Sequence, residues 1–149
     1  MRFVIQRVLG AEVDINGTEK RSIGKGYVVL IGVCNEDDNV ITEKMVRKLI
    51  NMRIFEDENG KTNLSLNDVD GELMLISQFT LYADCKKGNR PSFIKAGDPG
   101  YAEQVYQSII SLCKGHVKNV VTGEFGADMK ISLINDGPFT IFLDSDSIF

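Results

Sequence analysis

Two hydroxyl groups and one amide follow one another in the segment Ser77-Gln78-Phe79-Thr80, at the end of an apolar run. Because the apolar pattern gives way there to a polar loop, we expect these side chains at the open end of a buried strand. Together with nearby backbone N–H groups, they could orient an ester and stabilise the oxyanion that forms when it is attacked. Taken alone, such a segment is more often an ordinary strand end with ordinary hydrogen bonds.

A serine or threonine nucleophile usually needs a general base beside it, and the sequence has few candidates for such a base. The only histidine, His116, follows a helical pattern, where a partly exposed surface position is expected. A Ser-His-Asp triad is therefore disfavoured. An already activated ester fits better, because it needs positioning and oxyanion donors. A hydrolase of small esters or peptides with Thr80 as nucleophile stays open as an alternative.

A Gly-Pro pair interrupts a strand-like pattern near the end of the sequence. Residues 129–135 alternate in polarity, residues 139–144 continue the pattern, and Gly137-Pro138 lies between them. Proline gives no ladder hydrogen bond and glycine weakens a strand, so the pair has a local cost. We therefore predict that the pair ends the first strand and serves a turn or a site.

Four basic residues cluster within one polar loop: Lys86, Lys87, Arg90 and Lys95. The net charge of the chain is -4, which argues against broad electrostatic wrapping of nucleic acid but leaves room for a local basic patch. From charge alone, a solvated loop is the simpler interpretation. A non-catalytic RNA-binding module remains a second alternative.

Length and composition are those of one soluble domain spanning residues 1–149, with 43% hydrophobic and 26% charged residues. The N-terminal segment lacks a signal-peptide core, and the longest uncharged apolar run, Gly26–Asn35, is too short to cross a bilayer. We therefore expect a cytoplasmic protein that does not enter the membrane.

The cysteines Cys34, Cys85 and Cys113 are widely spaced and form no CxxC pair, so we predict free thiols. One histidine and three scattered cysteines do not make a zinc site. We predict no metal and no cofactor, although a magnesium ion held by carboxylates is harder to exclude from sequence.

Hydrophobic periodicity predicts two helices among many short strands. Asp37 or Asp38 could cap a helix over residues 39–52, and Asp98-Pro99 begins a second helix that Gly115 ends. Asn16-Gly17 is a strong signal for a type I′ hairpin. We predict an α+β fold with mainly antiparallel sheets, a barrel-like core and two principal helices.

The sequence resembles the D-aminoacyl-tRNA deacylases through six segments spread over essentially the whole chain. Each segment alone is weak, but the pair SQFT and NDGPFT, with GNRPSF between them, argues against chance similarity. The segments are IQRV at Ile5–Val8, IGKGYVVLIGV at Ile23–Val33, RIFEDENGKTNLSL at Arg53–Leu66, SQFTLYAD at Ser77–Asp84, KKGNRPSF ending at Phe93, and GEFGADMKISLINDGPFT at Gly123–Thr140.

The resemblance implies a homodimeric hydrolase that frees tRNA from wrongly attached D-amino acids, and from some glycine. It implies a pocket at the dimer interface, with a base formed by one subunit. The residues expected there are Ser77, Gln78, Phe79 and Thr80. A loop with Lys86, Lys87 and Arg90 suits a protein that grips the single-stranded acceptor end of tRNA.

The resemblance also gives the Gly-Pro pair a role. It implies that Gly137-Pro138 is a cis peptide that reaches into the partner's pocket and excludes L-amino acids, and that Arg7 holds this segment in place. Carbonyl groups of the pair would accept hydrogen bonds from the substrate's α-amino group. The terminal 2′-hydroxyl of the RNA would then assist the chemistry, so that no protein base is required.

Overall fold

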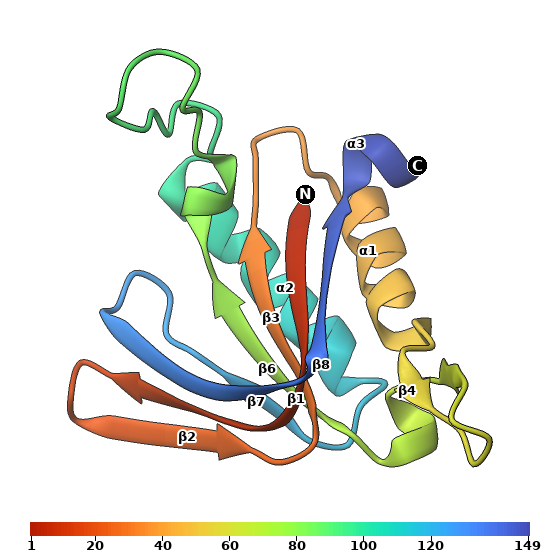
Figure 1. Cartoon of the computed structure of the whole chain (residues 1–149). Helices are drawn as coiled ribbons and strands as arrows, with labels where there is room; N and C mark the ends of the chain where they lie inside the picture. The colour runs from red at the N-terminus through yellow and green to blue at the C-terminus, as the bar shows by residue number, and fades with distance from the viewer.

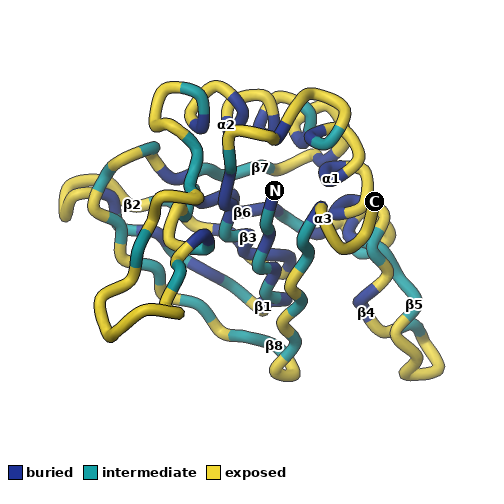
Figure 2. Tube along the Cα trace, turned by 90° about the horizontal axis from the view of Figure 1, so that it is seen from above, coloured by how far each residue is buried: buried dark blue, intermediate teal, exposed yellow.

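Two helices cover one face of a strongly curved sheet in the computed structural model, which describes residues 1–149 (Figures 1 and 2). The strands are β1 (Arg2–Ile15), β2 (Glu19–Ile23), β3 (Gly26–Gly32), β4 (Phe55–Glu56), β5 (Thr62–Leu64), β6 (Glu72–Ser77), β7 (Val120–Thr122) and β8 (Met129–Asp144). The helices are α1 (Asn39–Asn51), α2 (Pro99–Lys114) and α3 (Ser145–Ile148), with 3-10 turns η1 (Asn67–Val69) and η2 (Phe79–Tyr82). No helix is long and apolar enough to cross a membrane.

The long strand β1 organises the sheet. Its first half, Arg2–Val8, pairs antiparallel with β3, and its second half, Ala11–Ile15, pairs antiparallel with β2. Strand β8 pairs with β1 along both halves. Because one pair of long strands serves both halves, the sheet bends over itself into the nearly closed, barrel-like shape that the sequence predicted (Figure 1).

The sheet is mixed rather than purely antiparallel. Strand β6 runs parallel to β3 on one side and to β7 on the other. Parallel neighbours need a crossover connection, and α1 and α2 provide these two crossovers. The sequence prediction emphasised hairpins and missed both parallel pairs.

The central residues of β3 and β6 are all apolar because these strands face two separate cores. Alternate residues such as Tyr27 and Leu75 pack under the helices, in a cluster of 23 buried residues. Their neighbours Val28 and Met74 point into the hollow of the curved sheet, in a second cluster of 8. Side chains on successive strand positions point to opposite faces, so no polar face remains.

The helix boundaries follow the predicted signals closely. Asp38 is the N-cap of α1, and its side chain accepts a hydrogen bond from the Ile41 amide at 2.8 Å. Asp37, the other candidate, is instead buried and binds the amino group of Met1 and the Cys34 amide. Asp98 precedes Pro99 at the start of α2, without a side-chain cap hydrogen bond, and Gly115 follows its end.

The Gly-Pro pair does not end its strand, contrary to the prediction. Strand β8 continues through it, but pairing with β1 stops at Asn135, opposite Val8, and resumes at Thr140, opposite Gln6. Residues 136–139 therefore bulge out opposite Arg7 alone. A bulge tolerates a proline because no ladder donor is needed there. The Gly137-Pro138 bond is cis, as the resemblance implied.

Candidate functional site

A groove of about 770 Å³ opens at the carboxyl end of β6 and contains three of the four predicted catalytic residues, Ser77, Gln78 and Phe79. Its other walls are the segment 93–98, the start of α2 and the turn that leads into β8. Its remaining lining residues are Ile31, Val33, Ile76, Phe93, Ile94, Ala96, Gly97, Asp98, Pro99, Ala102, Tyr106, Phe125, Gly126, Ala127, Asp128, Met129 and Ile131.

The turn after β6, residues 77–82, sets the geometry of the groove's mouth. Ser77 is the last strand residue, and the Gln78 amide still donates to the carbonyl of Ile31 at 2.7 Å. The chain then tightens into η2, where the amides of Leu81 and Ala83 donate to the carbonyls of Gln78 and Thr80. The strand ends at Ser77, because a 3-10 turn takes up the residues from Phe79 to Tyr82.

Thr80, the fourth predicted catalytic residue, does not line the groove. Its hydroxyl accepts a hydrogen bond from the side-chain amide of Gln78. Phe79 projects outward, with 57% of its surface exposed. The first N–H groups of a helical turn have no partner within the turn, so the Phe79 and Thr80 amides are suitable donors to an anion.

An aromatic and apolar wall, missed by the sequence analysis, completes the groove. Phe93 meets Phe79 edge to face, with ring centroids 5.1 Å apart. Phe125 comes from the turn before β8, and Met129 is the first residue of β8. The signal was a large apolar residue within each of two polar segments, KKGNRPSF and GEFGAD.

Tyr106 on α2 lies deep in the same groove, and its hydroxyl donates to the Leu75 carbonyl at 2.7 Å. Burial raises the pKa of this phenol above its usual range. It therefore stays protonated at neutral pH and serves as a fixed wall.

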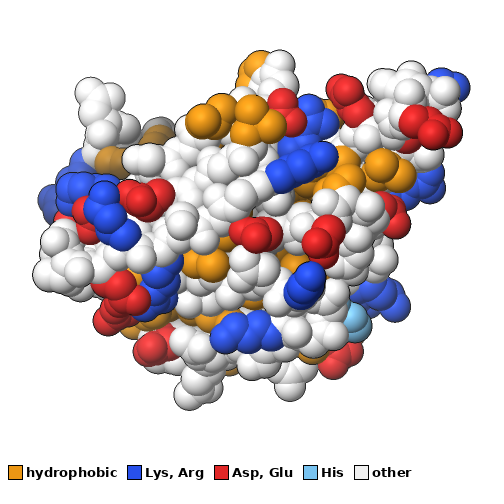
Figure 3. All heavy atoms as spheres, turned by 90° about the horizontal axis from the view of Figure 1, so that it is seen from below, with side chains coloured by type: hydrophobic (Ala, Val, Ile, Leu, Met, Phe, Trp, Pro, Cys, Tyr) orange, Lys and Arg blue, Asp and Glu red, His pale blue; other side chains and the backbone are white.

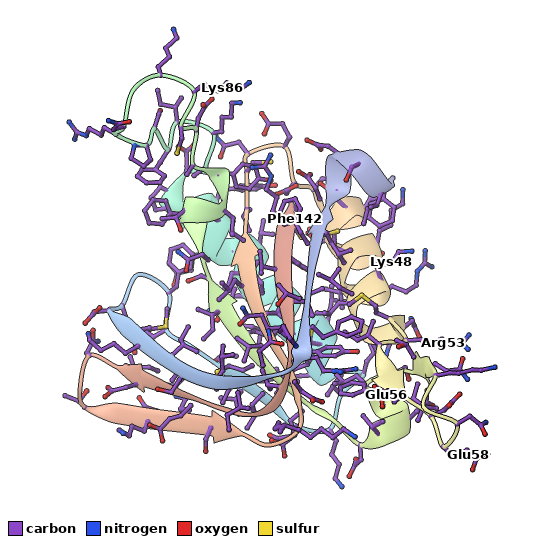
Figure 4. The ribbon with its side chains drawn as sticks, viewed as in Figure 1. Lys48, Arg53, Glu56, Glu58, Lys86 and Phe142 are labelled. Carbon is purple, nitrogen blue, oxygen red and sulfur yellow. The ribbon has the colours of Figure 1, made fainter.

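The basic cluster lies in a loop that rises beside the groove. Backbone hydrogen bonds between Asp84 and Ser92, at 2.8 and 2.9 Å, pin the base of this loop, which we call the basic loop (residues 84–92). Lys86, Lys87 and Arg90 are exposed on it, and Lys86 points away from the body of the molecule (Figure 4). The chain continues from this loop directly into Phe93.

Asp84 holds the basic loop from below. Its carboxylate accepts a hydrogen bond from the Lys86 amide at 2.9 Å and pairs with Lys95 at 3.4 Å. These contacts, led by the Lys86 amide, lower the pKa of Asp84. Of the four clustered cations, Lys95 is therefore already paired, while the three predicted RNA-binding residues have no ion pair within this chain.

Arg7 clamps the bulged segment of β8, which we call the Gly-Pro loop (residues 135–140). Its side chain is buried, and it donates to the carbonyls of Asp136 at 3.0 Å and Ile54 at 2.6 Å. Its guanidinium also stacks on Phe139, 4.6 Å from the ring centroid. The resemblance implied a bracing role for Arg7, and these are the contacts through which it would act.

Asn135 closes the same loop from within. Its side-chain oxygen accepts from the Phe139 amide at 2.6 Å, and its nitrogen donates to the Thr140 hydroxyl at 2.9 Å. Gly137 has a φ of 138°, a conformation that other residues rarely adopt. Gly137 and Pro138 are both exposed at the tip of the loop.

The groove and the Gly-Pro loop do not meet within one chain. Ser77 pairs with Ile31, which pairs with Phe3, whereas the loop lies opposite Arg7. The separation is therefore roughly 13 Å along the strands and about 14 Å across three strand spacings. No residue of the Gly-Pro loop lines the groove, so a site that uses both needs a second chain.

His116 is remote from the hydroxyls of the groove. It is exposed and lines a different groove, between α1 and α2, together with Lys44 and Arg47. No group of three or more His, Cys, Asp or Glu side chains is arranged to hold a metal ion. The three cysteines are unpaired, as predicted, with Cys85 exposed and Cys113 buried.

Comparisons with known proteins agree on one family. Residues 4–144 match the model for D-Tyr-tRNA(Tyr) deacylase. A D-aminoacyl-tRNA deacylase of Clostridium kluyveri is 55% identical over 149 residues, and one of Thermosipho africanus is 49% identical, each covering all of both chains.

Two solved structures have the same fold. A c-Myc DNA unwinding element binding protein superposes with a TM-score of 0.90 at 40% identity, covering 97% of this chain and 98% of that one. A probable eukaryotic D-amino acid tRNA deacylase gives a TM-score of 0.85, covering 95% of this chain and 97% of that one. At 15% identity, this second likeness concerns the fold alone.

A mixed, nearly closed sheet with a groove at a strand end, beside a small basic loop, is consistent with a hydrolase of the aminoacyl-tRNA deacylase class, and the family matches show that class. Within that class, the full-length matches are specific. The chain belongs to the D-aminoacyl-tRNA deacylase family.

Proposed function

We propose that this protein hydrolyses the ester bond of D-aminoacyl-tRNA in the cytoplasm, releasing free D-amino acid and tRNA, and that it rejects L-aminoacyl-tRNA. Glycyl-tRNA is a further substrate. The observation that carries the proposal is the groove with Ser77, Gln78 and the η2 turn at its mouth.

The apolar half of the groove suits the terminal nucleoside. Phe93, Phe125 and Met129 offer flat or adaptable apolar surfaces for an unstacked base, which is how proteins grip single-stranded RNA ends. The ester then lies towards Gln78 and Phe79. The phosphate backbone of the RNA then leads out of the groove towards the basic loop, where it meets Lys86, Lys87 and Arg90.

Catalysis rests on backbone donors at the turn. The amides of Phe79 and Thr80 stabilise the oxyanion that forms when water attacks the ester carbonyl. Gln78 and Thr80 hold one another, so the turn is ordered before the substrate arrives. The 2′-hydroxyl of the terminal ribose takes a proton from the attacking water and passes one to the ribose oxygen that departs when the acyl C–O bond breaks, since His116 lies in another groove.

Handedness is read by main-chain atoms. The carbonyls of Gly137 and Pro138, from a partner subunit, accept hydrogen bonds from the substrate's α-amino group. With the amine and the ester both fixed, a D side chain points outward and an L side chain meets rigid backbone. This is discrimination by exclusion, so glycine, which has no side chain to exclude, passes the gate.

A homodimer brings the two motifs together, because they are too far apart within one chain. Exposed apolar side chains lie where such a contact would form: Leu9 is 55% exposed, Ile134 62% and Phe142 56%. Ile134 pairs with Gly10 and the register shift skips Leu9, so both lie next to the pair of Val8 and Asn135 at which the Gly-Pro loop begins. On the face seen from below, hydrophobic side chains form several small groups among charged ones (Figure 3). A two-fold contact would use each motif twice and give two sites.

Incubation with D-, L- and glycyl-tRNA, followed by measurement of the freed amino acid, tests the proposal. Hydrolysis of D- and glycyl-tRNA with L-aminoacyl-tRNA left intact is the expected result. Binding of the RNA without release of any amino acid would instead identify a non-catalytic RNA-binding module. Comparable hydrolysis of the L- and D-forms would reject the proposal that the Gly-Pro loop excludes L side chains.

A further inference from the structure

A row of three residues at the end of the sheet lies directly beneath the 77–82 turn. Arg2 on β1 is paired with Gly32 on β3 and with Asp144 on β8. Residues directly opposite one another in a sheet present their side chains on the same face. Gly32 contributes no side chain, so the space over this position is available to another segment.

The turn occupies that space. A Cβ atom at Gly32 would lie 2.9 Å from the Cβ of Leu81 and 3.3 Å from the carbonyl oxygen of Gln78. Both distances are shorter than normal contacts, so the turn reaches its position only because residue 32 is glycine. The η2 turn therefore packs directly on Gly32.

Arg2 makes two contacts with the turn and one with Asp144, and together these hold the turn over Gly32. Its Nη1 donates to the carbonyl of Leu81 at 2.9 Å, and its guanidinium stacks 4.4 Å from the ring centroid of Tyr82. Its Nε donates to the Asp144 carboxylate, also at 2.9 Å. Asp144 therefore orients the arginine, and the arginine holds the carboxyl-terminal half of the turn.

We propose that Arg2, seated between Gly32 and Asp144, is a positioning residue for catalysis, because it fixes the turn that presents the Phe79 and Thr80 amides. This inference rests on the proposed function for its catalytic consequence, but the bracing of the turn is independent of it. Arg2 touches no substrate, and it is distinct from Arg7, which serves the Gly-Pro loop on the opposite face of β1.

The test compares Arg2→Met with a matched arginine variant, Arg21→Met. The side chain of Arg21 is 31% exposed against 29% for Arg2, and it likewise has one carboxylate partner, Glu19, and donates to main-chain carbonyls, those of Thr122 and Gly123. Arg2→Met should lower kcat for D-aminoacyl-tRNA by roughly tenfold with little change in KM, since a displacement of about 1 Å can cost as much as a hundredfold. Arg21→Met should leave kcat close to that of the unaltered protein.

Two further variants define the mechanism. Arg2→Lys keeps the charge but can satisfy fewer of the acceptors, so kcat should recover only in part. Asp144→Asn weakens the orientation of the arginine and should lower kcat in the same direction. Equal kcat values for Arg2→Met and Arg21→Met, or full activity of Arg2→Met, would overturn the proposal.

Hydrogen exchange provides a readout that does not depend on activity. The amides of Leu81 and Ala83, which are bonded within the turn, should exchange faster in Arg2→Met and stay protected in Arg21→Met. Unchanged protection in Arg2→Met would also reject the proposal that Arg2 holds the 77–82 turn in place. Suppose that the unaltered protein releases no amino acid, but the turn amides still exchange faster in Arg2→Met. The proposed function then fails, while the structural role of Arg2 in holding the turn stands.

Discussion

Thr80 accepts a hydrogen bond from Gln78 in the structure, so its hydroxyl has an orienting role rather than the environment of a nucleophile. We predict that Thr80→Val lowers the deacylation rate by less than roughly tenfold, because the loss of one such bond costs about 1 kcal/mol. Single-turnover assays would measure this, with Ser77→Ala as a companion variant. A loss of several orders of magnitude, or a covalent aminoacyl adduct on either residue, would restore the nucleophile hypothesis.

The three thiols should differ in reactivity because they differ in burial. Burial raises the pKa of Cys113 to about 12 and also raises that of the half-buried Cys34, whereas Cys85 is exposed on the basic loop. The thiolate is the reactive form. We predict that iodoacetamide at pH 8 modifies Cys85 first and Cys113 only after unfolding, as peptide mass spectrometry would show. Rapid labelling of Cys113 in the folded protein would contradict the described core.

In the proposed mechanism the shape of the Gly-Pro loop decides selectivity, and Arg7 contacts this loop through the carbonyl of Asp136 and the ring of Phe139. We predict that Arg7→Lys reduces the ratio of D- to L-aminoacyl-tRNA hydrolysis by about tenfold, equivalent to roughly 1.4 kcal/mol. A lysine cannot bind the carbonyls of Asp136 and Ile54 together and stack on Phe139.

Arg53→Lys is the control for this prediction, measured in the same paired assays with D- and L-substrates. Arg53 also bonds its neighbouring segment twice, through the main chain and side chain of Asn63, but on the β4–β5 side of the molecule (Figure 4). An unchanged ratio in Arg7→Lys, or an equal loss in both variants, would remove the special role of Arg7.

The basic loop is a second element with a separable role. We predict that neutralising Lys86, Lys87 and Arg90 together weakens tRNA binding and flattens its salt dependence, by roughly 0.7 for each single-strand phosphate that is no longer bound. Binding measured over a series of salt concentrations provides the slope. The matched control neutralises Lys44, Arg47 and Lys48 on α1, which also have no ion pair within this chain. An identical slope in both triple variants would make the basic loop a solvated surface only.

At the scale of the whole molecule, activity should depend on assembly. We predict that Ile134→Asp yields a monomer that has lost activity, because it puts a charge into the exposed apolar surface beside the Gly-Pro loop. Light scattering and the deacylation assay on the same sample measure both properties. Val40→Asp is the control, since Val40 is 57% exposed on α1, away from that edge. An active Ile134→Asp monomer would show that one chain suffices.

Much of this protein is determined by local sequence. Periodicity and caps determine α1 and α2 to within a residue or so, since helices depend on contacts between residues three and four apart. The hairpin at Asn16-Gly17 is equally local, and both residues have positive φ. The polar segment after β6 became a candidate site only through the resemblance, because such a segment alone is more often an ordinary strand end.

Only the tertiary structure decided how these elements combine. The parallel pairing of β6 with β3 and β7 joins residues far apart in sequence, and no local pattern encodes which strands become neighbours. The same holds for Phe93 and Phe125, which become walls of one groove, and for the row of Gly32, Arg2 and Asp144. The Gly-Pro bulge likewise depends on Arg7, a residue 129 positions from Asp136, because only a partner on another strand can hold four residues opposite one.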